Sequence, residues 1–169
     1  VLGTVDKGNR TKLMEMLNRP EIKSLLPADM ECRLAAKPNK DYKTKEITNT
    51  YDLYAIKKRL GSDNAPLDGE RVTRAFATPD PVKGGTSVSL SMDSRGAKIW
   101  GDMTTRAAND KNREIAIVLD DEVVSCPGVN EPILGGSSSI SGNFSIDEAK
   151  DLSNMLQVGK LPADVHIVQ

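Results

Sequence analysis

The chain has 169 residues, 38% of them hydrophobic, so it can bury one core, or one core with a small appended lobe. Its 23 basic and 24 acidic side chains give a formal net charge of -1, so no overall field attracts nucleic acid or an anionic membrane surface. Aromatic residues make up only 4%, which leaves few side chains to stack on bases. These features disfavour a nucleic-acid-binding role.

The first half of the chain alternates short helical and extended patterns. Leu13, Met14 and Leu17 fall at helical spacing and predict a helix over residues 9–18. A second short helix is expected between Pro20 and Pro27. Strands are expected at residues 30–37, 51–58 and 71–80. The polar segment 38–50 predicts an exposed loop, and residues 61–70 predict a turn region.

The second half has a more regular pattern. Residues 86–92 alternate at period two and predict a strand, followed by a helix over 93–110. The apolar stripe of that helix consists of Ala97, Trp100, Met103 or Thr104, and Ala107. Residues 114–120 predict a buried strand, 120–126 its hairpin partner, 145–157 a helix and 164–169 a last strand. This order is that of a split βαβ unit and predicts an α+β fold.

The last predicted helix has recognisable ends. Ser145 and Glu148 form the Ser-x-x-Glu pattern of a capping box, while Gly159 and Pro162 provide the stop. Its inward-facing residues are expected to be Ala149, Leu152 and Leu156.

The glycine and serine run before this helix, residues 133–145, raises the question of catalysis. A hydrolase elbow needs Gly-x-Ser-x-Gly, and a P-loop needs a lysine after its second glycine; neither pattern is present. The only histidine, His166, lies three residues from the end of the sequence, where a surface or packing role is favoured. The run is better explained by a turn at Gly135 and Gly136 and a strand through residues 138–141. A small serine-dependent hydrolase or ligand-binding enzyme stays as the alternative.

The remaining reactive groups predict no metal and no cofactor. Asp120, Asp121 and Glu122 are consecutive carboxylates that could ligate a hard cation, but their place between two apolar strands favours a hairpin turn. Cys32 and Cys126 lack metal-ligand spacing. Two separate buried thiols are favoured, and a disulfide stays open. The longest apolar run, residues 115–119, is far shorter than the ~20 residues of a membrane helix.

The second half of the sequence resembles the large periplasmic domain of SecD, the protein-export membrane subunit. The resemblance is carried by "EIAIVLDDEVVSCPGV", by "ILGGSSSISGNFSIDEAKDLSNMLQ" and by "GKLPADV", in which Asp164 stands where the family has proline. It covers residues 66–169, while residues 1–65 are similar to fused SecDF proteins of Bacteroidetes type. We therefore expect N-terminal helices and strands of the head region in 1–65 and a SecD-like core in 66–169. Residues 161–169 are expected to return toward the membrane-proximal part.

The resemblance implies a non-enzymatic role in protein export. It implies a periplasmic region of an inner-membrane protein, with membrane helices before Val1 and after Gln169. SecD acts with SecF beside the SecYEG channel, and the pair uses the proton gradient to draw unfolded preprotein outward. The proton-carrying groups lie in the membrane helices, so this region would contact the emerging polypeptide.

A binder of unfolded chains needs exposed apolar or strand-edge surface. One segment offers such residues among prolines and glycines: Val123, Val124, Val129, Ile133 and Leu134. The competing interpretation is that these side chains pack the core, and the pattern favours it.

Overall fold

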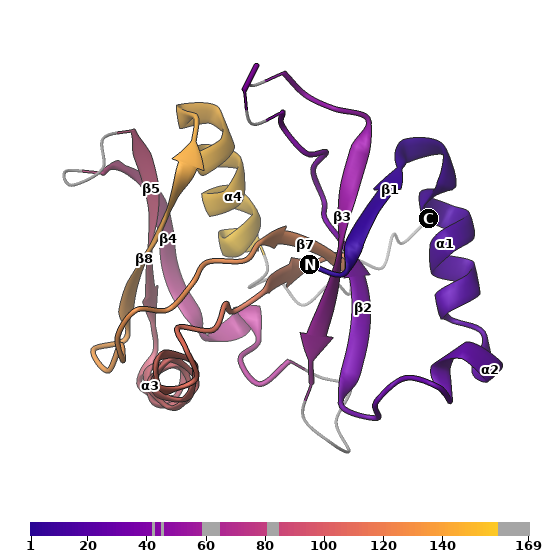
Figure 1. The fold of residues 1–169 in the computed structure, drawn as a ribbon. Helices are drawn as coiled ribbons and strands as arrows, with labels where there is room; N and C mark the ends of the chain where they lie inside the picture. Colours follow the sequence, from indigo (N-terminus) through magenta and orange to yellow (C-terminus); the bar gives the residue numbers. More distant parts are fainter. Residues whose placement is uncertain (42, 45, 59–64, 81–84, 159–169) are drawn as a thin grey trace, which may run out of the picture. The chain divides into compact units, whose positions relative to one another are not determined.

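The computed structural model describes residues 1–41, 43–44, 46–58, 65–80 and 85–158 (Figure 1). The chain combines helices with antiparallel sheets, which confirms the α+β class. The chain divides into two compact units. The N-terminal unit consists of Val1–Ala65 and Ala116–Cys126, and the C-terminal unit consists of Pro66–Ile115 and Pro127–Gln169.

The N-terminal unit contains an antiparallel sheet in the order β1-β3-β2. Its strands are β1 (Gly3–Asp6), β2 (Met30–Leu34) and β3 (Thr50–Lys57). β2 and β3 are the strands expected from the sequence. β1 was not expected, because only Val5 of its four residues is a large apolar side chain and its pairing with β3 is long-range, from Gly3 opposite Leu53 to Asp6 opposite Thr50.

Two helices follow β1 as the sequence predicts. α1 (Arg10–Leu17) comes after a 3-10 turn, η1 (Lys7–Asn9), and α2 (Pro20–Lys23) begins at the expected proline. No residue of α1 is fully buried; Leu13, Met14 and Leu17 are half-buried. The inward side of this helix is therefore only partly packed.

The polar segment before β3 forms no named element, although residues 42 and 45 lie outside the described part. Lys40 forms an isolated antiparallel bridge with Ile47, and the Asn39 N–H donates to the Thr50 carbonyl at 2.8 Å. Ile47 is 70% exposed. The described residues of this segment form a largely exposed loop whose two ends are joined by main-chain hydrogen bonds, as in a hairpin.

The hairpin of β6 (Ile117–Leu119) and β7 (Glu122–Ser125) corrects two sequence predictions. The strand over 114–120 was expected to be buried, but β6 has three residues, none of them fully buried. It starts late because Glu114 bridges Gly128 and the Ile115 N–H donates to the Pro127 carbonyl, at 3.0 Å.

The second correction concerns the split βαβ arrangement, which requires β6 and β7 to share a sheet with β5 (Thr86–Met92). Among the described residues they form a separate two-stranded sheet. The hairpin also belongs to the N-terminal unit, although the sequence analysis placed it in the core of 66–169. The cause is long-range bonding: Val123 bridges Ala35 in parallel, and the Ala36 N–H donates to the Val123 carbonyl at 2.8 Å.

The C-terminal unit has an antiparallel sheet in the order β4-β5-β8. β4 is Val72–Pro79, preceded by a 3-10 turn, η2 (Gly69–Arg71), and β8 is Ser137–Phe144. Val88 and Leu90 of β5 alternate with serines, and Val88 pairs with Ile140 while Leu90 pairs with Ala75. These four side chains are buried and form the core face of the sheet.

α4 (Ile146–Val158) covers this sheet on one face, as Figure 1 shows. Its predicted inward residues, Ala149, Leu152 and Leu156, are all buried. The predicted capping box is present: the Ser145 N–H donates to Glu148 Oε2 at 2.9 Å, and the Glu148 N–H donates to Ser145 Oγ at 3.2 Å. The predicted stop at Gly159 and Pro162 lies outside the described residues, as does the strand over 164–169.

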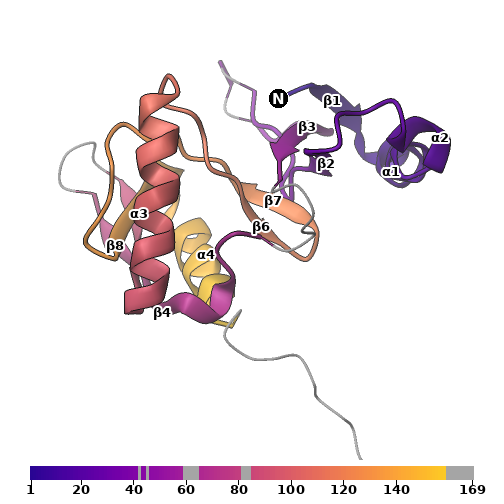
Figure 2. The ribbon, with the colours of Figure 1, turned by 90° about the horizontal axis from the view of Figure 1, so that it is seen from below.

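α3 (Ser94–Asn109) lies at one end of the same sheet (Figure 2). Asp93 caps it by accepting a bond from the Gly96 N–H at 2.7 Å. Its buried stripe contains Trp100, Thr104 and Ala107, so Thr104 rather than Met103 occupies the inward position. The Thr104 hydroxyl donates to the Trp100 carbonyl at 2.8 Å and accepts the Ile133 N–H at 2.9 Å.

Among the described residues, no helix combines the length and the apolar character needed to cross a membrane.

Candidate functional site

The serines of the glycine and serine run belong to a strand of the C-terminal sheet. Ser137 pairs with Ser91, Ser139 with Ser89 and Ser141 with Ser87. Because side chains alternate across a strand, these hydroxyls share the face opposite Val88. A serine nucleophile needs a base beside it, and the only histidine, His166, lies outside the described residues. The serines are explained by the geometry of the sheet, and Ser145 by the helix cap.

The turn that precedes the serines of this run is formed by glycine, as the sequence predicts. Gly136 has a φ of +69°, a backbone conformation that glycine adopts without strain. Its carbonyl accepts the Met92 N–H at 2.8 Å.

The acidic cluster forms the hairpin turn that the sequence favours. Asp120 and Asp121 have φ values of 47° and 66°, the left-handed conformation of a two-residue hairpin loop. Asp121 pairs with Arg33, and Glu122 pairs with Arg10. Two of the three carboxylates therefore neutralise arginines within the N-terminal unit. No group of three or more histidine, cysteine, aspartate or glutamate side chains suited to a metal ion occurs in the described ranges.

Arg10 connects three parts of the N-terminal unit. Besides Glu122, it donates to the Ala35 carbonyl at 3.3 Å, and its guanidinium lies 4.0 Å from the ring centroid of Tyr51. A cation over an aromatic face gains electrostatic energy. This arginine therefore ties the start of α1 to β3 and to the β6-β7 hairpin.

The five predicted polypeptide-contact residues are divided between the two units. Val123 and Val124 belong to the N-terminal unit, and Val129, Ile133 and Leu134 belong to the C-terminal unit. Val123 and Val129 are buried, so they pack their units and present no surface. Val124 and Ile133 are half-buried. Leu134 is 73% exposed and is the most accessible of the five.

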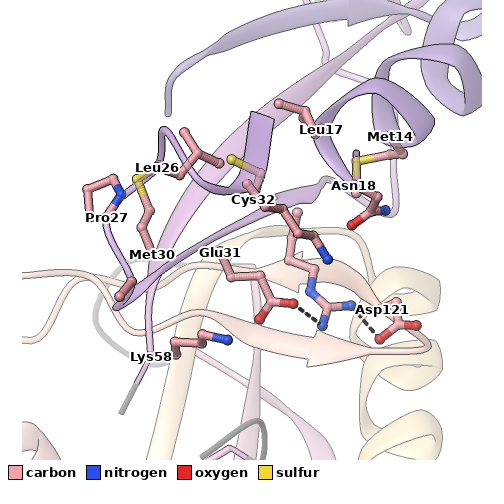
Figure 3. Close-up of a pocket in the computed structure, with 13 residues that line it drawn as sticks. Met14, Leu17, Asn18, Leu26, Pro27, Met30, Glu31, Cys32, Lys58 and Asp121 are labelled. Carbon is pink, nitrogen blue, oxygen red and sulfur yellow. Dashed lines mark hydrogen bonds and ion pairs between the residues drawn. The ribbon is translucent and has the colours of Figure 1, made fainter. Parts of the chain in front are cut away.

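A pocket of about 380 Å³ in the N-terminal unit was missed by the sequence analysis (Figure 3). It lies beside β2, between the end of α1, the loop after α2 and the tip of the β6-β7 hairpin. Its lining combines seven apolar or sulfur-containing residues with five charged residues and one asparagine. The lining residues are Met14, Leu17, Asn18, Lys23, Leu26, Pro27, Ala28, Met30, Glu31, Cys32, Arg33, Lys58 and Asp121.

Three of the charged side chains of this pocket, Glu31, Arg33 and Asp121, pair with one another. Arg33 donates to Glu31 at 2.7 Å and also bonds to Asp121, as the dashed lines in Figure 3 mark. Burial lowers the pKa of Arg33, but the bond with Asp121 and the charge of Glu31 outweigh it, so the pKa is raised and the guanidinium stays charged. Burial, and then the charge of Glu31, raise the pKa of the Cys32 thiol. Cys32 is buried, Cys126 is half-buried, and no disulfide joins them.

The helical spacing of Leu13, Met14 and Leu17 was the available signal for this pocket, and it was used only to predict a helix. The spacing is correct, but α1 buries no residue fully, so its inward side chains line a cavity. Methionine is flexible and polarizable and packs against varied apolar partners. The arrangement can hold an apolar group, and it offers no residue set for acid-base or nucleophilic chemistry.

Comparison with known proteins gives a consistent result. Residues 44–163 match the family described as "SecDF, P1 head subdomain". Protein translocase subunit SecD of Rhodothermus marinus is 36% identical over 170 residues, which is all of this chain and 25% of that protein. The same subunit of Desulfurispirillum indicum is 43% identical over 101 residues, 60% of this chain and 19% of that protein.

Solved structures overlap with part of the chain. A crystal structure of SecDF in a super-membrane-facing form shares 33% identity with a TM-score of 0.47, covering 59% of this chain and 13% of that one. A second structure, of a membrane component SecDF that enhances protein export, shares 30% identity with a TM-score of 0.46, covering 62% and 48%.

The chain thus spans about a quarter, or less, of the length of these curated relatives. The family match extends over well more than half of the chain and includes β3, both helices of the C-terminal unit and the serine strand β8. The chain belongs to the SecDF P1 head subdomain family.

Proposed function

We propose that this chain is the periplasmic head of a SecD-type subunit and assists preprotein export driven by the proton gradient. The match of residues 44–163 to the SecDF head family carries this proposal. The relative that aligns along the whole chain is a protein translocase subunit. The partners of such a head are SecF, the SecYEG channel and the unfolded preprotein, and its place is the periplasmic side of the inner membrane.

The contribution of the head is mechanical and not catalytic. The serine run has structural roles in the sheet and the cap, and the acidic cluster is a turn whose carboxylates pair with arginines. No observation favours the alternative of a serine-dependent hydrolase. An ester-hydrolysis assay with a Ser138→Ala control tests it: activity that disappears with this hydroxyl would support the enzyme.

Leu134 is the side chain of the predicted set best placed to touch a passing polypeptide. It is 73% exposed, and it follows Ile133, whose main chain is held by Thr104. Its side chain rests near Gly101, where an added Cβ would lie 3.2 Å from Leu134 Cδ2. The apolar surface is thus presented from an anchored backbone.

Site-specific photocrosslinking in the full-length membrane protein tests this contact. A crosslinker at Leu134 is expected to trap a preprotein arrested during export. Ile146 is the matched control, because it is an aliphatic residue of the same unit with 62% exposure. Equal crosslinking at both positions, or none at Leu134 while export proceeds, would contradict the proposed contact.

A further inference from the structure

The outer edge of β2 carries main-chain groups that point away from its sheet. The Ala35 N–H donates to the Asp52 carbonyl, and the Lys58 N–H donates to the Asp29 carbonyl, both at 2.8 Å. Bonding alternates along an antiparallel strand, so odd-numbered residues of this segment bond to β3. Met30, Cys32 and Leu34 therefore direct their main-chain groups to the outer edge.

This edge already accepts a strand at one end. Val123 of β7 bridges Ala35 in parallel, and the Ala36 N–H donates to the Val123 carbonyl at 2.8 Å. β7 begins at Glu122, and the turn residue Asp121 meets the Arg33 side chain. The hairpin therefore covers the edge only as far as Arg33. The Met30 N–H donates to the Pro27 carbonyl at 2.9 Å. Within the described ranges, no strand pairs with the outer side of the remaining Met30–Cys32 stretch, which therefore offers the Met30 carbonyl and both main-chain groups of Cys32.

The pocket runs along this uncovered stretch. Four consecutive residues of β2, from Met30 to Arg33, line it. Because consecutive side chains of a strand point to opposite faces, a pocket touched by all four lies at the strand edge. Its other wall consists of Met14 and Leu17 of α1 and of Leu26 in the loop after α2.

The strand edge and the side chains that line the pocket determine which kind of ligand can bind. An unpaired strand edge binds extended main chain through hydrogen bonds, whatever the sequence, and the adjacent pocket takes a side chain. The Arg33 charge is already shared by Glu31 and Asp121, so the pocket's other charged side chains are Lys23 and Lys58. The wall facing β2 is aliphatic and thioether. A basic side chain buried there would lose its hydration and meet like charges, whereas an aliphatic side chain would gain apolar contacts.

We propose that this β2-edge groove binds an extended stretch of polypeptide by strand addition, with one aliphatic side chain in the pocket. The inference deepens the proposed function and rests on it for the nature of the partner, an unfolded chain. It adds a second contact in the N-terminal unit, distinct in residues from Leu134, that recognises main chain rather than sequence. Sequence tolerance of this kind is what a carrier of diverse preproteins requires.

Binding is measured with the 169-residue chain and a fluorescein-labelled ten-residue peptide of alternating valine and threonine, with a lysine at each end. Fluorescence polarisation gives the affinity. Leu26→Asp places a charge in the pocket and is expected to weaken binding at least about tenfold. Leu25→Asp is its matched control, because Leu25 is 79% exposed and does not line the pocket; it is expected to leave the affinity unchanged.

The main-chain contribution is tested by a second pair of variants. Cys32→Pro removes an N–H that points outward, so the ladder with β3 is kept, and the affinity is expected to fall about three- to tenfold. Cys32→Ala keeps that N–H and is expected to bind within about threefold of the parent chain. A peptide N-methylated at alternate amides is expected to bind as weakly as Cys32→Pro does. If circular dichroism shows that Cys32→Pro does not fold, the N-methylated peptide alone tests the main-chain contribution.

Several results would overturn the inference. One is no binding of the peptide at about 1 mM chain, and another is binding that neither Leu26→Asp nor N-methylation weakens. Dimers in sedimentation that Leu26→Asp dissociates would assign the groove to a second copy. A higher affinity after removal of residues 159–169 would assign it to the end of this chain. Retained crosslinking at Leu134 in any of these cases leaves the proposed function standing.

Discussion

Gly136 is the residue whose replacement should damage the C-terminal unit most specifically. It turns the chain into β8 with a φ of +69°, and an added Cβ would lie 2.7 Å from the Cβ of Ala97 on α3. The main chain of Gly136 is also held in place by a hydrogen bond, because the Gly136 carbonyl accepts the Met92 N–H. Gly136→Ala therefore combines backbone strain with a clash between the turn and a helix.

The two costs can be estimated separately. A left-handed φ costs a non-glycine residue about 1–2 kcal/mol, and overpacking of this kind costs about 1–3 kcal/mol. The expected loss in the free energy of unfolding is thus about 2–5 kcal/mol. Gly135→Ala is the matched control, since no atom lies within 4 Å of its added Cβ, and a change within about 0.5 kcal/mol is expected.

Urea unfolding followed by tryptophan fluorescence measures the effect. Trp100 is the only tryptophan and is buried in α3 of the same unit. With a urea dependence of about 1–3 kcal/mol per M, the midpoint should fall by about 1–5 M. Adding Ala97→Gly removes the clash but not the strain, so the double-mutant cycle should show about 1–3 kcal/mol of coupling. Equal stabilities of Gly136→Ala and Gly135→Ala, or no coupling, would refute this explanation.

Three further predictions use the same unfolding assay or thiol chemistry. Ser145→Ala removes the hydroxyl of the capping box and should lower the free energy of unfolding by about 1 kcal/mol; an unchanged midpoint would contradict the cap. The bond from the Gly96 N–H, aided by Arg71, holds the pKa of Asp93 below its usual value. Its stabilising effect is therefore present above the ordinary aspartate pKa of about 3.9 and is lost as pH falls through the lower value in the folded state. Asp93→Asn, which can accept the same bond without charge, should flatten this acid-side loss, and a parallel loss in both proteins would exclude the idea. Because burial and then Glu31 raise the pKa of Cys32, alkylation of Cys32 in a Cys126→Ser variant at pH 8 should be at least about tenfold slower in buffer than in urea. Equal rates would show that the thiol is accessible and ordinary.

Local patterns predicted the elements of the C-terminal unit well. The alternation over residues 86–92 matches β5 (Thr86–Met92) residue for residue. The Ser145–Glu148 pair forms both bonds of its box. In each case the determining contacts lie within one element or between residues close in sequence. Patterns of this range are readable because period, cap and turn chemistry act on neighbouring residues.

Partner choice between distant segments was not predictable. The apolar run that contains β6 indicated a buried strand, yet Val118 is 38% exposed. The hairpin leaves its predicted unit because Val123 bonds with Ala35 and Ala36, more than 80 residues earlier. No periodicity encodes which strand edge a hairpin will join. The pocket was missed for a related reason: a pocket remains where an amphipathic helix is not fully covered, and the sequence pattern reports only the helix.

The hairpin turn connects these observations. Two consecutive aspartates tolerate the left-handed backbone of a two-residue loop, and this loop sets Leu119 opposite Glu122. That register places Asp121 on Arg33 and Glu122 on Arg10. Because β7 begins only at Glu122, the hairpin does not extend along the β2 edge to Cys32, and Asp121 becomes part of the pocket lining. The acidic cluster that suggested a cation site in the sequence thus fixes how much of the strand edge is available for another chain.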